Sequence, residues 1–179
     1  MSLINDISNL AMAQATVTYA NVNERALAIK GSLYDLKQTL PAHSADRDDL
    51  FQIAETKRLT ALLYLTETLS RTLDQTSLTQ QQYTSSIRHL MTTIIRQISS
   101  LPDSATLLWP LFVLGNSGSV NEDHRRFVLD RLGRLQKTRN LGSVRRARMA
   151  VKKAFQMVDL DSRGRSRWSA ETIGCISLA

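Results

Sequence analysis

Apolar residues recur every three or four positions through most of this chain, a period that predicts α-helices. The clearest set is Leu50, Ile53, Ala54, Ala61, Leu62 and Leu65. The run ALLYL at 61–65 is apolar on every side, which predicts a place in the core. Turn signals are scarce, with seven Gly and three Pro in 179 residues. We therefore expect an all-α fold: an irregular bundle of six to eight helices in one domain, with residues 1–20 as an N-terminal helical segment and 21–179 as the main body.

Capping patterns predict where several helices begin. One helix is expected over 24–40, before Pro41, and another after Asp46. Thr79, with Gln82 three residues later, forms a capping box that predicts the start of a third helix. Asp103 is the expected N-cap of the helix that follows.

The segment after Asp103 contains the signals for a kink and for a helix end. Pro110 lacks a backbone donor and is expected to kink or divide its helix, and Gly115 with the following residues of GNSGS at 115–119 is expected to end it. Ser119 and Glu122 form another capping box, and Ser143 is the expected cap of the last long helix.

The sequence contains neither a membrane span nor a cysteine framework. Its longest apolar run, Leu107 to Leu114, is interrupted by Pro110 and is much shorter than the roughly 20 residues that cross a bilayer. The first residues lack the basic region of a secretory signal. The only cysteine, Cys175, excludes an internal disulfide and any site with several thiolates, as expected in a reducing compartment.

Basic residues are concentrated in the last third of the chain. Residues 1–124 contain nine Lys/Arg and 12 Asp/Glu, whereas residues 125–167 contain 14 Lys/Arg and three Asp. The candidate basic surface consists of Arg145, Arg146, Arg148, Lys152 and Lys153. A solvated helix face or a protein contact is favoured, because aromatic residues do not interleave with the cations; contact with nucleic acid or an anionic membrane is the alternative.

No residue set supports catalysis, a cofactor or a metal. His43, His89 and His124 lack any metal-ligand spacing, and GNSG at 115–118 follows no strand that would make it a phosphate loop. Acidic neighbours such as Glu122 and Asp123 are explained by the first turn of a helix, where negative charge is favoured. We expect a non-enzymatic protein without a cofactor.

The segment 107–159, followed by a late tryptophan, resembles the C-terminal part of the fungal-specific transcription factor domain. That family has an LLWPLF-x-x-G helix, an acidic pair before an Arg-rich helix, and a further helix after a glycine turn. The matching residues here are Trp109, Pro110, Phe112, Gly115, Asp123, Arg126 and Trp168. The segment 55–69 also resembles the core helix of the family. Phe155 stands where the family commonly has tryptophan. Trp109, Phe112 and Trp168 are most simply anchors of the core.

The resemblance implies a helical regulatory region that acts in the nucleus on transcription by RNA polymerase II. In this family the domain accompanies a zinc-cluster DNA-binding module with six cysteines, which a chain with one cysteine cannot form. The partners implied are proteins of the transcription machinery or the rest of a full-length factor, with no membrane. The alternative is a stand-alone co-regulator that binds protein or nucleic acid through its basic helical face.

Overall fold

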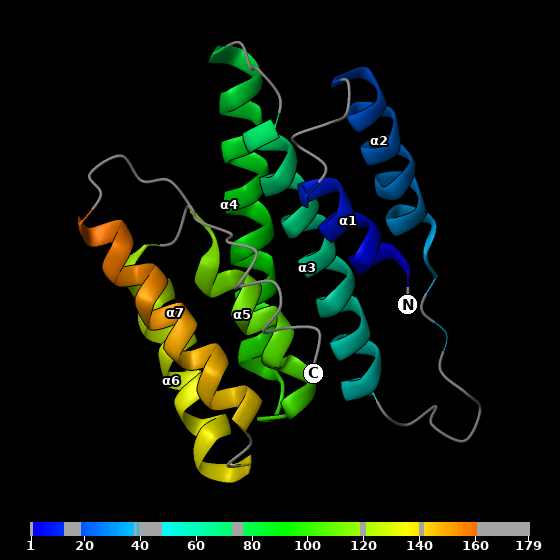
Figure 1. The fold of residues 1–179 in the computed structure, drawn as a ribbon. Coiled ribbons are helices and arrows are strands. Elements are labelled where there is room, and N and C mark those ends of the chain that lie inside the picture. The colour runs from blue at the N-terminus through cyan, green and yellow to red at the C-terminus, as the bar shows by residue number, and fades with distance from the viewer. Residues whose placement is uncertain are drawn as a thin grey trace. The chain divides into compact units, whose positions relative to one another are not determined.

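The computed structural model describes residues 2–12, 19–37, 39, 48–72, 77–118, 121–139 and 142–160. These residues form seven α-helices and one 3-10 helix, without a strand (Figure 1), so the all-α prediction is confirmed. The elements are α1 (Ser2–Met12), α2 (Tyr19–Asp35), α3 (Asp48–Thr72), α4 (Ser77–Ser100), η3 (Ala105–Leu107), α5 (Leu108–Asn116), α6 (Glu122–Arg139) and α7 (Gly142–Leu160).

The chain divides into two compact units, Met1–Ile94 and Ile95–Ala179. Helix α4 begins in the first unit and ends in the second. The expected division into residues 1–20 and 21–179 does not coincide with this boundary and stays a prediction.

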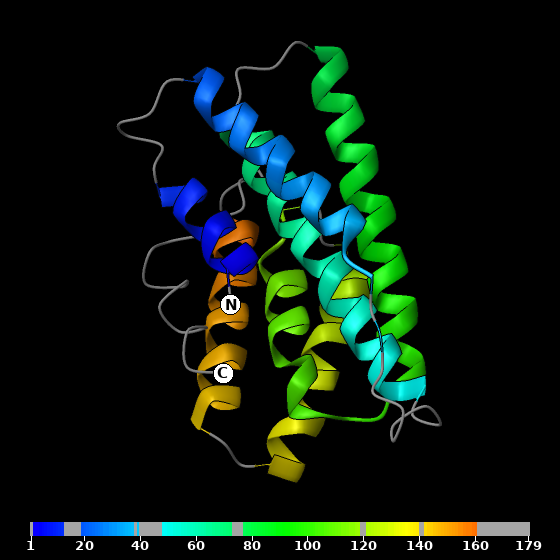
Figure 2. The same cartoon turned by 90° about the vertical axis from the view of Figure 1, so that its right-hand side faces the viewer.

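The first unit contains three helices that pack against one another, α1, α2 and α3. Helix α2 lies alongside α3 (Figure 2). Each helix contributes a stripe of buried apolar residues: Ile7 and Leu10 from α1; Ala26, Ile29 and Leu33 from α2; and Ile53, Leu62, Leu63 and Leu65 from α3. All five residues of ALLYL at 61–65 are buried, as the sequence predicts.

Helix α3 also carries threonines into the core. Thr56, Thr60 and Thr68 are at most 1% exposed. Each hydroxyl donates to the carbonyl oxygen four residues earlier, at 2.7 to 2.9 Å. Because the helix itself accepts these hydrogen bonds, burial leaves no hydroxyl donor without a partner.

Helix α2 differs from its expected bounds, because it begins at Tyr19 and ends at Asp35 instead of extending to residue 40. Arg58 of α3 explains part of this early end. Its Nη1 donates to the carbonyl oxygen of Leu33 at 3.1 Å, which satisfies one of the carbonyls that a helix leaves unpaired in its last turn. Arg58 also pairs with Glu55 one turn earlier.

The second unit contains α5, α6 and α7, each of which packs against the other two. All nine residues of α5 are buried, as befits a segment in which apolar residues lie on every side. Helices α6 and α7 run side by side in opposite directions (Figure 1). Each has one stripe of buried apolar residues. Val128, Leu132 and Leu135 of α6 and Val144, Val151 and Phe155 of α7 are buried.

Two predicted helix starts are wrong. Helix α4 begins at Ser77, so Thr79 lies inside the helix instead of capping it. Helix α7 begins at Gly142 and contains Ser143.

The helix predicted after Asp103 is divided into η3 and α5, and the division lies two residues before Pro110. Pro110 is the third residue of α5, in the first turn, where its missing N–H group removes no hydrogen bond of α5.

Two predicted caps are replaced by neighbouring residues. Ser104, not Asp103, caps η3, because its side chain accepts from the N–H of Thr106. Asn121 caps α6, because its Oδ1 accepts from the N–H of His124 at 2.8 Å. Asn121 takes the place of Ser119, the cap expected from the sequence. Ser119 itself, like Asp46 and Trp168, lies outside the described residues.

Candidate functional site

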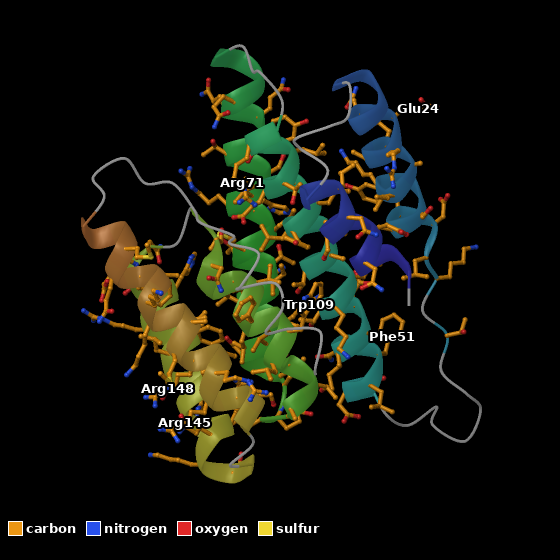
Figure 3. The ribbon with its side chains drawn as sticks, viewed as in Figure 1. Glu24, Phe51, Arg71, Trp109, Arg145 and Arg148 are labelled. Carbon is orange, nitrogen blue, oxygen red and sulfur yellow. The ribbon has the colours of Figure 1, made fainter. Side chains whose placement is uncertain are left out.

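Helix α5 carries the tryptophan, proline, phenylalanine and glycine of the sequence motif. Trp109 is 9% exposed and Phe112 is 1% exposed, and Pro110 and Gly115 are buried beside them. Figure 3 labels Trp109 on this helix. These residues form a packed core element and are not available at the surface.

Gly115 marks the closest approach of α5 to its two neighbours. A Cβ atom on residue 115 would lie 2.6 Å from Cγ1 of Val151 and 3.2 Å from Cγ1 of Val128. Helix α5 ends at Asn116, within the predicted stop GNSGS at 115–119, and Gly115 itself is still a helical residue. Its missing side chain lets α6 and α7 pack directly against the backbone of α5.

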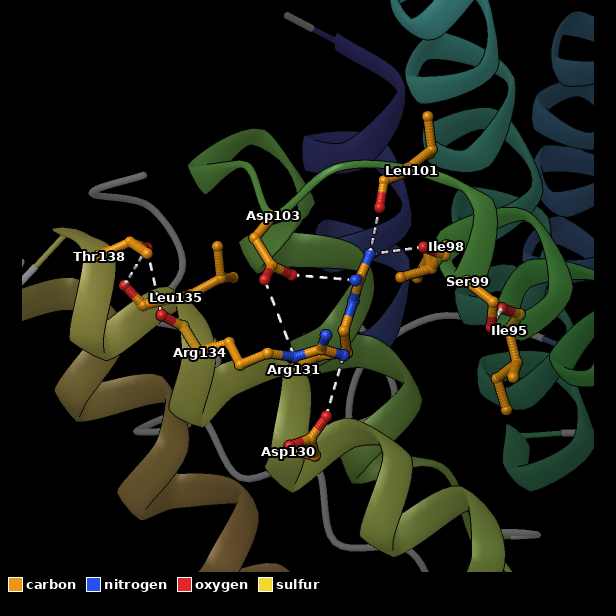
Figure 4. Close-up of polar contacts among 10 residues, drawn as sticks. All are labelled: Ile95, Ile98, Ser99, Leu101, Asp103, Asp130, Arg131, Arg134, Leu135 and Thr138. Atoms are coloured by element: carbon orange, nitrogen blue, oxygen red, sulfur yellow. Dashed lines mark hydrogen bonds and ion pairs between the residues drawn. The ribbon is translucent and has the colours of Figure 1, made fainter.

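A buried arginine joins α6 to the end of α4 (Figure 4). Arg131 is 5% exposed, and its Nη2 donates to the carbonyl oxygens of Ile98 at 2.5 Å and Leu101 at 2.6 Å. Its Nη1 contacts Oδ1 of Asp103 at 2.9 Å. Arg131 therefore satisfies carbonyls at the C-terminal end of α4 and fixes the turn that leads into η3.

The position of Arg131 in the sequence is a signal that its side chain is buried. Position 131 lies three residues after Val128 and four before Leu135, on the stripe that the sequence predicts to be buried. A cation on a buried stripe requires polar partners in the core. Nothing in the pattern identifies those partners as two carbonyls and Asp103.

The motif residues at the start of α6 are exposed or pair with their neighbours. Asp123 is exposed in the first turn, where the helix dipole favours a carboxylate. Arg126 lies on the surface, with Nε 3.3 Å from Oε1 of Glu122. The Arg125 guanidinium lies 5.2 Å from the ring centroid of Phe155, a cation–π contact between α6 and α7.

Four of the five candidate basic residues are exposed on α7: Arg145, Arg146, Lys152 and Lys153. Among the residues that the structure describes, none of these four forms an ion pair. Met149 lies on the same face and is 61% exposed, so an apolar side chain lies among these cations at the surface. Figure 3 labels Arg145 on this helix.

The fifth candidate, Arg148, occupies a different environment. It is half-buried, and its Nη1 donates to Oε1 of Gln136 on α6 at 3.1 Å. Its Nη2 lies 3.9 Å from where a Cβ of Gly133 would stand. Arg148 therefore connects α7 to α6 along the edge of the exposed face.

A second surface feature lies in the first unit. An open depression of about 530 Å³ is lined by Tyr34, Leu36, Lys37, Thr39, Phe51, Glu55 and Arg58. Tyr34 and Phe51 are 63% and 44% exposed. The charged residues of this lining are Lys37 and the Arg58–Glu55 pair. The hydrogen bond from Arg58 holds the pKa of Glu55 below its usual value.

Neither a cluster of metal ligands nor a membrane-spanning helix is found among the residues that the structure describes. No three His, Cys, Asp or Glu side chains gather there as metal ligands would. No helix in the same ranges has both the length and the apolar character required to cross a membrane.

The fungal specific transcription factor domain matches residues 1–173. The chain belongs to this family. No curated protein and no solved structure matches the chain. The resemblance seen in the sequence spans roughly Ala26 to Trp168, and the match over residues 1–173 extends it at both ends, so both units belong to the fungal specific transcription factor domain.

Proposed function

We propose that this fungal specific transcription factor domain is a regulatory and interaction domain that contributes to RNA polymerase II transcription in the nucleus and has no enzymatic activity. The observation that carries the proposal is the family match over residues 1–173. Its partners are proteins of the transcription machinery or other parts of a transcription factor.

The distribution of side chains supports a protein-contacting function. The motif residues of α5 are buried and support the fold, so contact with a partner falls to the exposed faces. Met149 on α7 and Phe51 on α3 are exposed apolar residues beside charged ones, a combination that occurs at contact surfaces.

A tethering assay in a fungal cell tests the proposal. The full chain is fused to a heterologous DNA-binding module, and transcription of a reporter with the matching binding sites is measured. The proposal predicts a change in reporter output relative to the module alone. Leu132→Asp places a charge in the core of the second unit and serves as the control with a damaged fold. Equal output from the fusion and the module alone would contradict the proposal.

A further inference from the structure

The exposed face of α7 carries its cations in two rows. Arg145 and Lys152 form one row, and Arg146 and Lys153 form the other. Residues seven apart on a helix differ by only about 20° around the axis and by roughly 10.5 Å along it. Each row therefore places two positive charges on one edge of the face.

An apolar side chain occupies the space between the rows. Helical geometry places Met149 midway between them, with Gln156 about two turns further along. Met149 is 61% exposed, and its flexible, polarisable thioether adapts to different apolar surfaces. The α7 face, defined as these six residues, thus combines a central apolar contact with positive charge on both sides.

The part of α7 that carries this face has cations without carboxylates. The residues from Gly142 to Met157 include five Lys or Arg and no Asp or Glu, and Asp159, the one acidic residue of α7, comes seven residues after Lys152. Arg148 donates to Gln136, but the four cations of the two rows form no ion pair within the described ranges. Charge complementarity therefore calls for an acidic partner.

The centre of the face favours a protein over a nucleic acid. A helix that reads a DNA groove presents hydrogen-bonding side chains to the base edges, and Met149 offers none. A specific DNA interface also buries roughly 1,000 Å² or more of protein surface. The cations of α7 span only about 12 Å of one helix. On the adjacent α6, the exposed cations Arg126 and Arg134 form ion pairs with Glu122 and Asp130 of the same helix.

We propose that the α7 face binds an acidic segment of a protein partner. An apolar side chain of this segment contacts Met149, and carboxylates on either side of it contact the two rows of cations. This inference rests on the proposed regulatory function, since it specifies the chemistry of the partner. Carboxylates seven residues apart on a helix, or about three apart in an extended segment, match the spacing within each row.

Fluorescence polarisation with the full chain tests this inference. The probe is a labelled 20-residue peptide of Asp, Glu and Leu, with leucines every three or four residues. A second peptide of equal charge has glutamine in place of leucine. We expect the leucine peptide to bind at least fivefold more tightly than the glutamine peptide, and its binding to weaken as salt is raised.

Two sets of variants separate the two parts of the face. Arg145→Glu with Lys152→Glu is expected to weaken leucine-peptide binding at least tenfold. The matched control reverses two exposed cations elsewhere, Lys57→Glu on α3 and Arg88→Glu on α4, and is expected to change binding less than twofold. Met149→Ser keeps the charge and is expected to weaken binding three- to tenfold. All these positions are exposed, so a thermal melt confirms that each variant folds.

Three results would overturn the inference. The first is absence of leucine-peptide binding at low salt, and the second is equal binding by wild type and Met149→Ser. The third is tighter binding of a 20-base-pair DNA duplex than of the peptide, if the α7 double variant loses the duplex binding. That result would make the face a nucleic-acid surface. The reporter assay distinguishes the two proposals: a reporter response without peptide binding leaves the regulatory function standing and removes only this inference.

Discussion

Gly115 of α5 lies so close to Val151 of α7 that a Cβ on residue 115 would approach the two Val151 methyl carbons to 2.6 and 2.7 Å. Both are shorter than any normal carbon–carbon contact. In an open helix Gly→Ala is favourable by about 1 kcal/mol. Here Gly115→Ala must move packed helices, and we expect a net loss of about 1–3 kcal/mol in the free energy of unfolding, measured by urea denaturation.

Gly31 provides the matched control for this substitution. It lies on α2, and a Cβ there meets no atom within 4 Å. Gly31→Ala should therefore raise the free energy of unfolding by about 0.5–1 kcal/mol. In a double-mutant cycle, Val151→Ala should recover part of the loss in Gly115→Ala, because it removes the methyl groups that the new Cβ meets. Equal effects of the two glycine substitutions would contradict the packing argument.

The position of Gly115 shows what sequence patterns can and cannot predict. A glycine near the end of an apolar run is typical of a helix end. Gly115 is placed instead by the approach of α6 and α7, and that tertiary contact leaves no mark on the local sequence. The apolar period itself depends only on which residues share a helix face, so the all-α fold and the buried run at 61–65 could be predicted.

Substitution of Arg131 tests the link between α6 and the end of α4. Arg131→Met leaves the carbonyls of Ile98 and Leu101 and the carboxylate of Asp103 without their main partner, and we expect a loss of about 3 kcal/mol in the free energy of unfolding. Arg131→Lys should recover little, because one ammonium group lacks the planar fork that reaches all three acceptors.

Arg134 supplies the control for Arg131. It also contacts Asp103, at 3.8 Å, but its side chain is 47% exposed. Arg134→Ala should cost less than about 1 kcal/mol, as is usual for exposed ion pairs. Similar losses for Arg131→Met and Arg134→Ala would show that burial of the Arg131 guanidinium is energetically unimportant.

Asn121 caps α6, and its substitution tests that assignment. Asn121→Ala removes the acceptor for the N–H of His124 and should lower the free energy of unfolding by about 1 kcal/mol. Asn121→Asp keeps an acceptor oxygen at the cap and should remain close to wild type. If alanine and aspartate gave the same stability, the hydrogen bond at Asn121 would not contribute.

Two capping boxes in the sequence predicted the wrong N-cap residues. Thr79 and Ser119 each stand three residues before a Gln or Glu, which satisfies the pattern. The structure begins α4 at Ser77, and it caps α6 with Asn121. Several polar residues near a helix start can serve as the cap, so the pattern alone does not identify which one does. The spacing of the α7 cations predicts that they lie on the polar face of the helix. The spacing does not predict that Arg148 is half-buried, because that depends on its contact with Gln136 of α6.

His124 should make stability depend on pH near neutrality. Partial burial lowers the pKa of His124 below its usual value of 6.5, and the smaller effect of the Asp123 charge opposes this. The unfolded chain then binds a proton at a higher pH than the folded chain. The free energy of unfolding should therefore fall as the pH drops through 6.5 toward the folded-state pKa, and level off below it.

Urea denaturation at pH 5 to 8 measures this loss, which His124→Gln should remove. His89→Gln, at an exposed position on α4, should follow the wild-type curve. A constant difference between wild type and His124→Gln across this range would show that burial of His124 does not couple its protonation to folding.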